Sequence, residues 1–154
     1  STSAEMRDAV AKELKNNYDV AIMAAAVADF APAKRSAKKL DTRAGGMSVS
    51  LIPTAKIVDD VKKINKSTFL VAFKADYDVS DAVLVDKAYN KLKECNADLV
   101  VANDVGRKGS MAGSDDNEVF IVDKKRKVVH VPLDSKQAVA RRLLEIVSKS
   151  LKDD

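Results

Sequence analysis

The chain has 154 residues, of which 46% are hydrophobic and 32% are charged, and its formal net charge is +4. This length and apolar content are enough for one domain with its own core. The single Cys95 excludes an internal disulfide framework, and together with the single His130 it argues against a structural zinc site. Because the sequence has neither 18 consecutive apolar residues nor a signal peptide, we expect a soluble, cytoplasmic protein with no membrane partner.

The first half of the chain predicts helices that alternate with strands. Apolar spacing, N-cap residues and helix breakers define each element. In chain order we expect a helix from Ser3, as its N-cap, to about Lys15, a buried strand over Val20–Ala26, a polar, basic loop over residues 30–46, a half-buried strand over Met47–Ile52, and a helix that begins at Pro53 or Thr54.

The second half continues this alternation. In chain order we expect a buried strand over Phe69–Ala75, a helix capped by Ser80 to about Cys95, a strand over Asp98–Ala102, a loop over 103–117, a β-hairpin of Val119–Val122 with Val128–Val131, and a final helix capped by Ser135. Strands joined by helices imply right-handed crossovers. We therefore predict one α/β domain over residues 1–154, with a Rossmann-like, mostly parallel sheet flanked by helices.

The end of the first strand is a candidate ligand site. Ala24–Ala26 carry almost no side chain, so another molecule can approach the backbone, and Asp29 follows where the strand gives way to a loop. In open α/β sheets, ligands bind outside the carboxyl ends of the strands. Plain core packing of the alanines is an equally good interpretation.

Further candidates fall at the same predicted edge. The basic loop over 30–46 can close over an anion as a mobile flap, although an ordinary solvated loop is the more common case. Phe73 can stack on a base or pack in the core. Lys87 and Lys91 share a helix face, which suits either an anion between them or plain solvation. Asn103-Asp104 follows the third strand and either orders a ligand or turns the chain.

The glycine motifs of nucleotide-binding domains are absent. Such domains usually begin with a strand and a Gly-rich loop, whereas this chain begins with a predicted helix and has only five glycines. Neither G-x-G-x-x-G nor G-x-x-x-x-G-K-[ST] occurs. Either the protein binds no nucleotide, or its opening segment is missing from this chain.

Several short motifs, in this order, resemble phosphopantothenate–cysteine ligase, also called phosphopantothenoylcysteine synthetase. The matching segments are Ala25–Phe30, Lys39-Leu40, Leu51–Ile57, Val71–Asp76, Lys91-Leu92, Ala97–Val105 and Asp115–Val119. Each motif is weak alone, but together they are in register along nearly the whole chain. The resemblance implies the C-terminal ligase domain of a bifunctional coenzyme A biosynthesis protein, truncated before residue 1.

The resemblance also implies a reaction and its partners. Enzymes of this family activate the carboxylate of 4′-phosphopantothenate with CTP or ATP and Mg²⁺, and an acyl-nucleotidyl intermediate forms as pyrophosphate leaves. The amine of cysteine then attacks the acyl carbon. A homodimer with shared sites, no nucleic-acid partner, and a flavin-dependent decarboxylase fused upstream are further expectations.

Residue roles follow from the resemblance position by position. Asp29 matches an acid that helps to hold the nucleotide, and Lys39 matches the catalytic flap lysine that stabilises developing charge. The other predicted nucleotide-binding residues are Met23, Ala24 and Ala25, the backbone segment Ala55, Lys56, Ile57 and Val58 at a helix start, Phe73 near the base, and Lys91 at a phosphate. No protein ligand to a metal is predicted.

Two positions depart from the family pattern. The family usually has Lys-x-Lys-Lys or Lys-x-Lys-Ser where this chain has Lys39-Leu40-Asp41-Thr42, so Lys38 is the alternative flap lysine. Cys95 stands where the family can place a lysine, and we interpret it as a structural thiol. The alternative function is a non-enzymatic nucleotide- or RNA-binding module, which the small number of aromatic residues disfavours. A third is an NAD-type Rossmann oxidoreductase, which the missing glycine motif disfavours.

Overall fold

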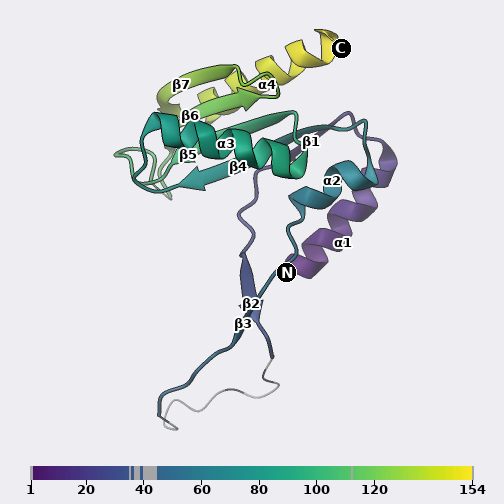
Figure 1. Ribbon diagram of the computed structural model, residues 1–154, viewed down its shortest axis with the longest axis vertical. Helices are drawn as coiled ribbons and strands as arrows, with labels where there is room; N and C mark the ends of the chain where they lie inside the picture. The colour runs from purple at the N-terminus through teal and green to yellow at the C-terminus, as the bar shows by residue number, and fades with distance from the viewer. Residues whose placement is uncertain (1, 35, 37–38, 40–44, 112, 154) are drawn as a thin grey trace.

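A five-stranded sheet forms the centre of the computed structural model, which describes residues 2–34, 36, 39, 45–111 and 113–153 (Figure 1). The strand order is β1 (Val20–Met23), β4 (Phe69–Asp76), β5 (Leu99–Asp104), β6 (Asp116–Asp123) and β7 (Val128–Ser135). The strands β1, β4 and β5 are parallel, whereas β6 and β7 form an antiparallel hairpin. The predicted Rossmann-like α/β sheet with its C-terminal hairpin is confirmed.

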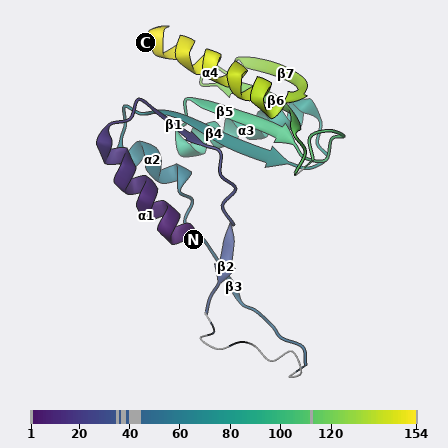
Figure 2. The same ribbon diagram turned by 180° about the vertical axis from the view of Figure 1, so that it is seen from behind.

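Helices pack on both faces of this sheet (Figures 1 and 2). On one face lie α2 (Val58–Ile64) and α3 (Asp81–Cys95), with α1 (Ser3–Glu13) beside α2, and on the other face lies α4 (Lys136–Asp153). Leu70 of β4 belongs to the core under α2 and α3, whereas its neighbour Val71 belongs to the core under α4. Because successive strand residues point to opposite faces, burial on both sides requires a nearly continuous apolar run.

Side-chain caps set the starts of α1, α3 and α4. The Oγ of Ser80 accepts a hydrogen bond from the Val83 N–H at 3.4 Å, and that of Ser135 accepts one from Ala138 at 3.2 Å, as predicted. The N-cap of α1 is Thr2, however, and not Ser3. A capping box decides this, because the required glutamate stands three residues after Thr2.

Several predicted boundaries are wrong by a few residues. The third strand and both strands of the hairpin extend into the loops predicted beside them, and Phe30–Pro32, predicted as the start of the basic loop, is a strand because it pairs with Leu51–Pro53. The helix α1 stops at Glu13 and gives way to a 3₁₀ turn over Leu14–Asn16. The strand β1 ends at Met23 and not at Ala26, because its pairing with β4 ends there. The helix α2 begins at Val58 and not at residue 53 or 54, since the preceding residues bind the chain that follows β1.

Residues 30–34 and 45–53 belong to an arm that extends away from the sheet (Figures 1 and 2). Its paired strands are β2 (Phe30–Pro32) and β3 (Leu51–Pro53), which run antiparallel. Met47, Val49 and Leu51 are 64%, 52% and 55% exposed, so the predicted half-buried strand over Met47–Ile52 is wrong. The apolar alternation is present, but no core of this chain lies beneath it. Residues 35, 37–38 and 40–44 of the predicted flap lie outside the described residues, so the flap stays a prediction.

Candidate functional site

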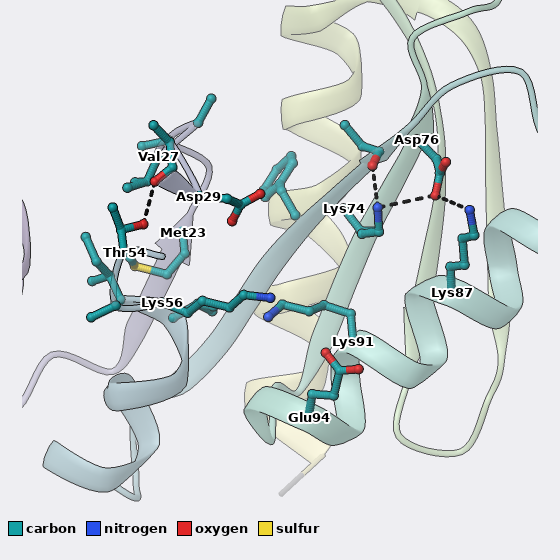
Figure 3. A pocket seen from close by; sticks show the side chains of 18 of the residues that line it. Met23, Val27, Asp29, Thr54, Lys56, Lys74, Asp76, Lys87, Lys91 and Glu94 are labelled. Carbon is teal, nitrogen blue, oxygen red and sulfur yellow. Dashed lines mark hydrogen bonds and ion pairs between the residues drawn. The ribbon is translucent and has the colours of Figure 1, made fainter. Parts of the chain in front are cut away.

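A cavity of about 660 Å³ opens at the carboxyl ends of β1 and β4 (Figure 3). The segment after β1, the loop before α2, the end of β4 and one side of α3 enclose it. The lining residues are Met23, Ala25–Asp29, Thr54–Val58, Phe73–Asp76, Lys87, Asn90, Lys91 and Glu94. The cavity therefore lies where ligands bind in open α/β sheets.

The structure brings the predicted nucleotide-binding residues together. All of them line the cavity except Ala24, which lies between two lining residues in the chain. Phe73 packs against the core under α4 and also lines the cavity, so the core role is confirmed and the stacking on a base stays a prediction. Lys39 is exposed and does not line the cavity, and Lys38 lies outside the described residues. The roles of all these residues stay predictions.

Hydrogen bonds to the segment after β1 hold the loop before α2 in place. The Thr54 N–H donates to the carbonyl of Asp29 at 2.9 Å, and the Thr54 hydroxyl donates to the carbonyl of Ala28 at 2.6 Å. The side chain of Ile57 is 5% exposed and anchors the other end of the loop. The segment after β1 and the loop before α2 are thus tied together. Within the described chain, no side chain or backbone group forms a hydrogen bond or ion pair with the carboxylate of Asp29.

Asp76 forms ion pairs with two of the cavity's lysines. Its Oδ2 lies 2.8 Å from the Lys87 ammonium and 3.3 Å from that of Lys74. The hydrogen bond from Lys87, followed by the Tyr77 N–H and the Lys74 ammonium, lowers the pKa of the Asp76 carboxyl to about 2 against the cost of its burial. The carboxylate is therefore charged at neutral pH, and Lys87 is not a free partner for Lys91.

Lys91 has its own carboxylate partner on the neighbouring helix. Its Nζ lies 3.3 Å from Oδ1 of Asp59, and only 14% of its side chain is exposed. Figure 3 shows that the Lys56 side chain points toward Lys91 across the cavity. Among the residues that the structure describes, Lys56 has no carboxylate within ion-pair distance. Two ammonium groups of like charge therefore face one another, and only one of them is paired.

Cys95 is a structural thiol, as predicted. Its side chain is 3% exposed in the core under α3, and Sγ donates to the carbonyl of Lys91 at 3.0 Å. Burial raises the pKa of the thiol above its ordinary value. The side chain is thus turned away from the cavity and into the core.

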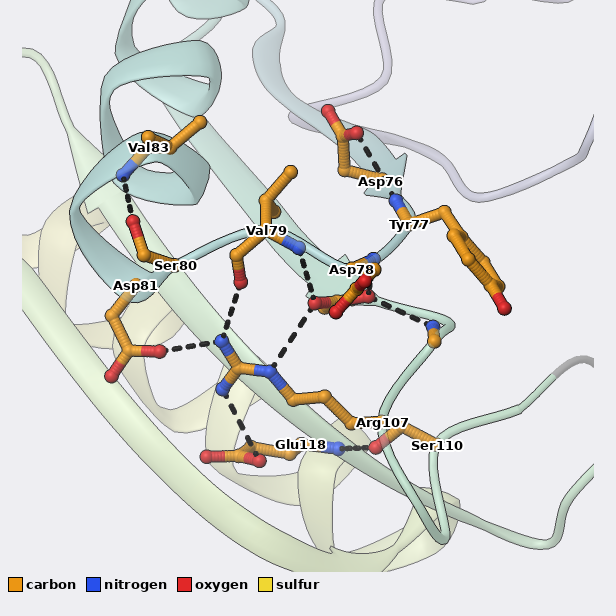
Figure 4. Close-up of polar contacts among 12 residues, drawn as sticks. Asp76, Tyr77, Asp78, Val79, Ser80, Asp81, Val83, Arg107, Ser110 and Glu118 are labelled. Atoms are coloured by element: carbon orange, nitrogen blue, oxygen red, sulfur yellow. Dashed lines mark hydrogen bonds and ion pairs between the residues drawn. The ribbon is translucent and has the colours of Figure 1, made fainter.

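Asp104, at the end of β5, belongs to a second polar cluster at the same edge of the sheet (Figure 4). Its carboxylate accepts backbone N–H groups from Asp78 and Gly106, each at 2.8 Å, and from Val79 at 3.0 Å. Burial alone would raise the pKa of Asp104, but the three N–H donors and Arg107 lower it below its usual value. Of the two interpretations of Asn103-Asp104, the turning of the chain is therefore the one that the contacts support.

Arg107 closes this second cluster. Its guanidinium lies 2.5 Å from Asp81 and 3.5 Å from both Asp104 and Glu118. The hydrogen bond that Arg107 donates to Asp81 acts against burial and, with Glu118, raises the Arg107 pKa. Glu118 in turn lies 2.7 Å from Nε2 of His130, which stacks on Phe120. The cluster joins the ends of β4, β5 and β6 and satisfies its own charges.

Several cavity residues are absent from the sequence prediction. Asn90 and Glu94 could have been found, because they lie three and seven residues after Lys87 on the same face of a helix. The ion pairs that Asp59, outside the lining, and Asp76 make with the cavity lysines could not, since their lysine partners stand 32 and 11 residues further along the chain. Within the described residues, no group of three or more His, Cys, Asp or Glu side chains could hold a metal ion, and no helix could cross a membrane.

A family profile matches this chain almost from end to end. The profile describes the DNA/pantothenate metabolism flavoprotein C-terminal domain, and it matches residues 1–151. The chain belongs to this family. The predicted resemblance to the C-terminal part of a coenzyme A biosynthesis protein is confirmed by the relatives that follow.

The relatives of this flavoprotein C-terminal domain include proteins named as bifunctional. The chain is 36% identical over 151 residues to the coenzyme A biosynthesis bifunctional protein CoaBC of Thermococcus kodakarensis and 34% identical to that of Bacillus subtilis. These matches cover 97% and 96% of this chain, but only 36% and 35% of the length of the two relatives. A cysteine/cysteine sulfinic acid decarboxylase of an unknown prokaryote is 34% identical, with 95% and 41% covered. The chain thus spans about two fifths or less of the curated relatives it matches.

Solved structures share the fold. The DNA/pantothenate metabolism flavoprotein of Streptococcus pneumoniae superimposes with a TM-score of 0.80 at 25% identity, covering 97% of this chain and 71% of that one. The C-terminal domain of a CoaBC protein gives a TM-score of 0.75 at 28% identity, with 99% and 64% covered.

Proposed function

We propose that this chain carries the ligase chemistry of coenzyme A biosynthesis, the joining of cysteine to 4′-phosphopantothenate at the cost of a nucleoside triphosphate. The observation that supports it most directly is the cavity, where four segments distant in the chain meet at the ligand-binding edge of the sheet. These segments hold the residues to which the resemblance gives a nucleotide-binding role. Two relatives at 34% and 36% identity are named as coenzyme A biosynthesis proteins, which supports a role in that pathway.

The proposed reaction has two steps. First, a carboxylate oxygen of 4′-phosphopantothenate attacks the α-phosphorus of CTP or ATP, and the bond to pyrophosphate breaks. Second, the amine of cysteine attacks the acyl carbon, and the bond from that carbon to the phosphate oxygen breaks. The nucleoside monophosphate leaves with the electron pair of this bond, and the amine loses a proton. Both steps build negative charge on phosphate oxygens, which is why a cavity with four lysines is suitable.

Mg²⁺ fits this site as a companion of the nucleotide. Magnesium is usually held by one or two carboxylates together with substrate phosphates and water. Asp29 lines the cavity, and its carboxylate is without a partner in the described part of the chain, so it can supply a protein oxygen. We propose Asp29 for this contact, with the phosphates of CTP or ATP as the other ligands.

The arm supports the proposal of a homodimer. Phe30, Met47 and Ile52 are 57%, 64% and 50% exposed on a segment that extends from the sheet (Figure 2). Apolar side chains presented in this way are typical of an interface with another chain. We propose a second copy of this chain as the partner, with Lys39 of the flap delivered to a cavity when the arm is covered. A flavin-dependent decarboxylase part upstream and a cytoplasmic location complete the proposal.

A panel of ligands tests the function. The melting temperature of the protein is measured with CTP, ATP, NAD or an RNA oligomer, each with and without Mg²⁺. We expect CTP or ATP with Mg²⁺ to raise it, whereas NAD and RNA leave it unchanged. Stabilisation by RNA or NAD alone would favour the RNA-binding module or the oxidoreductase. Pyrophosphate release that requires 4′-phosphopantothenate then distinguishes an enzyme from a nucleotide-binding module.

A further inference from the structure

We infer that the side chain of Lys56 binds phosphate, and that Lys56 and Lys91 together form a clamp for a phosphate group in the cavity. The inference rests on the proposed function for the identity of the ligand. It assigns Lys56 a role of its own, because the resemblance gives this position a backbone contact only. It also gives Asp59 a role, because the Asp59 carboxylate competes with the incoming anion for the Lys91 ammonium.

The backbone at Lys56 is held firmly. The hydrogen bonds of Thr54 tie the start of its loop to the segment after β1, and the buried Ile57 follows directly. The carbonyl of Lys56 also accepts the Asp59 N–H at 3.1 Å, which fixes the turn into α2. The flexible stem of Lys56 therefore begins at a fixed point and reaches into the cavity, where Figure 3 shows it pointing toward Lys91.

The charges of the cavity point to the same place. Lys74 and Lys87 are both engaged by Asp76, whose low pKa keeps that carboxylate charged. Lys91 shares Asp59, and Lys56 has no carboxylate partner in the part of the chain that the structure describes. Lys56 is therefore the lining lysine whose charge is open to an anion within the described chain, and Lys91 faces it with a like charge that repels it when no anion is bound.

The ligand group that suits both lysines is a phosphate. With Asp59 on Lys91, a single negative charge balances the pair, but a carboxylate that binds Lys56 cannot also replace Asp59 on Lys91. A terminal phosphate or a pyrophosphate brings two or more negative charges on several oxygens, so it can bind Lys56 and compete with Asp59 for Lys91. Lysine is a suitable partner, because it acts as a point charge toward phosphate oxygens. Two ligands of the proposed reaction carry such a group, namely the nucleoside triphosphate and 4′-phosphopantothenate, and the experiment distinguishes them.

The clamp predicts opposite effects for two neighbouring residues. In Lys56→Gln one cation is lost, so affinity for inorganic pyrophosphate should fall about tenfold, as measured by ³¹P NMR titration at low salt. In Asp59→Asn the competing carboxylate is lost, so the same affinity should rise about threefold. Lys66→Gln is the matched control, because Lys66 is exposed and does not line the cavity, and it should leave the affinity unchanged.

The outcomes separate the clamp from the proposed function. If the unsubstituted protein does not bind pyrophosphate, or if Lys56→Gln binds it as tightly, the clamp is wrong. Titrations with CTP, ATP and 4′-phosphopantothenate then identify the source, since Lys56→Gln should weaken whichever ligand places its phosphate there. If pyrophosphate behaves as expected but none of these three ligands binds, the clamp holds and the proposed function fails.

Discussion

Two polar clusters lie at the same edge of the sheet, and they differ in how their charges are satisfied. Asp76 and Asp104 are register partners at the ends of β4 and β5. The cluster around Asp104 uses backbone N–H groups and Arg107, so its members satisfy one another. The cavity beside Asp76 leaves Asp29 and Lys56 without an ionic partner within the described chain. A satisfied network holds the chain together, whereas open charges are available to a ligand.

The largest effect is expected from Lys39 of the predicted flap, which would bring a further positive charge to the cavity. In a form of the protein that catalyses ligation, Lys39→Gln should lower kcat on the order of 100-fold and change the KM for nucleotide much less. Charge develops on the phosphate oxygens only during attack, which is the reason for this difference. Rapid measurement of acyl-nucleotide formation locates the affected step.

Lys38→Gln is the control for register. A strong loss of kcat in Lys38→Gln with nearly normal Lys39→Gln would move the catalytic role by one residue. If neither variant changes kcat by more than a few-fold, the assignment of a flap lysine is wrong for this protein.

The cluster around Asp104 and Arg107 should govern the thermal stability of the fold. Asp104→Ala removes the acceptor of three backbone N–H groups and leaves Arg107 with less compensation, so the melting temperature should fall by roughly 5–10 °C. Differential scanning calorimetry measures this. Asp115→Ala, at an exposed position in the following loop, should change it by less than about 2 °C. Equal melting temperatures for the two variants would contradict the structural role of Asp104.

The cavity residues without an ionic partner in the described chain should govern nucleotide binding instead. Asp29→Ala should lower the affinity for CTP or ATP with Mg²⁺ about tenfold, because the loss of one charged hydrogen-bond partner costs about 1.5–3 kcal/mol. Its melting temperature without ligand should not change, since no group of the described chain depends on this carboxylate. Titration calorimetry tests the first statement and a melting curve the second. Unchanged binding would remove Asp29 from the site.

The smallest effect concerns pH and the stability that Asp76 provides. Its pKa is about 2 in the folded state and near 3.9 in an unfolded chain, so its ion pairs stabilise the fold above about pH 4. This contribution is lost as the pH falls from about 4 to about 2. Asp76→Asn should therefore cost about 1 kcal/mol or less at pH 7, and almost nothing at pH 2. Urea denaturation at several pH values measures the difference, and a cost that is constant with pH would contradict it.

Local patterns in the sequence predicted most of the fold. The apolar run of Phe69–Ala75 is long and flanked by breakers, so a strand buried on both faces could be identified without its neighbours. Ser80 and Ser135 cap their helices through bonds that span three residues, which a sequence displays directly. The expected place of the cavity followed from the same patterns, because strand ends on one edge of a parallel sheet must meet.

Patterns that depend on a distant surface were not decided in this way. Met47, Val49 and Leu51 alternate with serines as a half-buried strand does, yet they are exposed because the arm lies away from both cores. The same holds for charges: the sequence placed Lys87 and Lys91 on one helix face, whereas the tertiary structure gave one to Asp76 and the other to Asp59. Periodicity is a property of neighbouring residues, so the sequence alone determined the helices, the five strands of the central sheet and the edge they share, but not the strands of the arm. Burial and ion pairing require atoms from separate segments within a few ångströms, so only the tertiary structure decided which charges are satisfied and which stay open for a ligand.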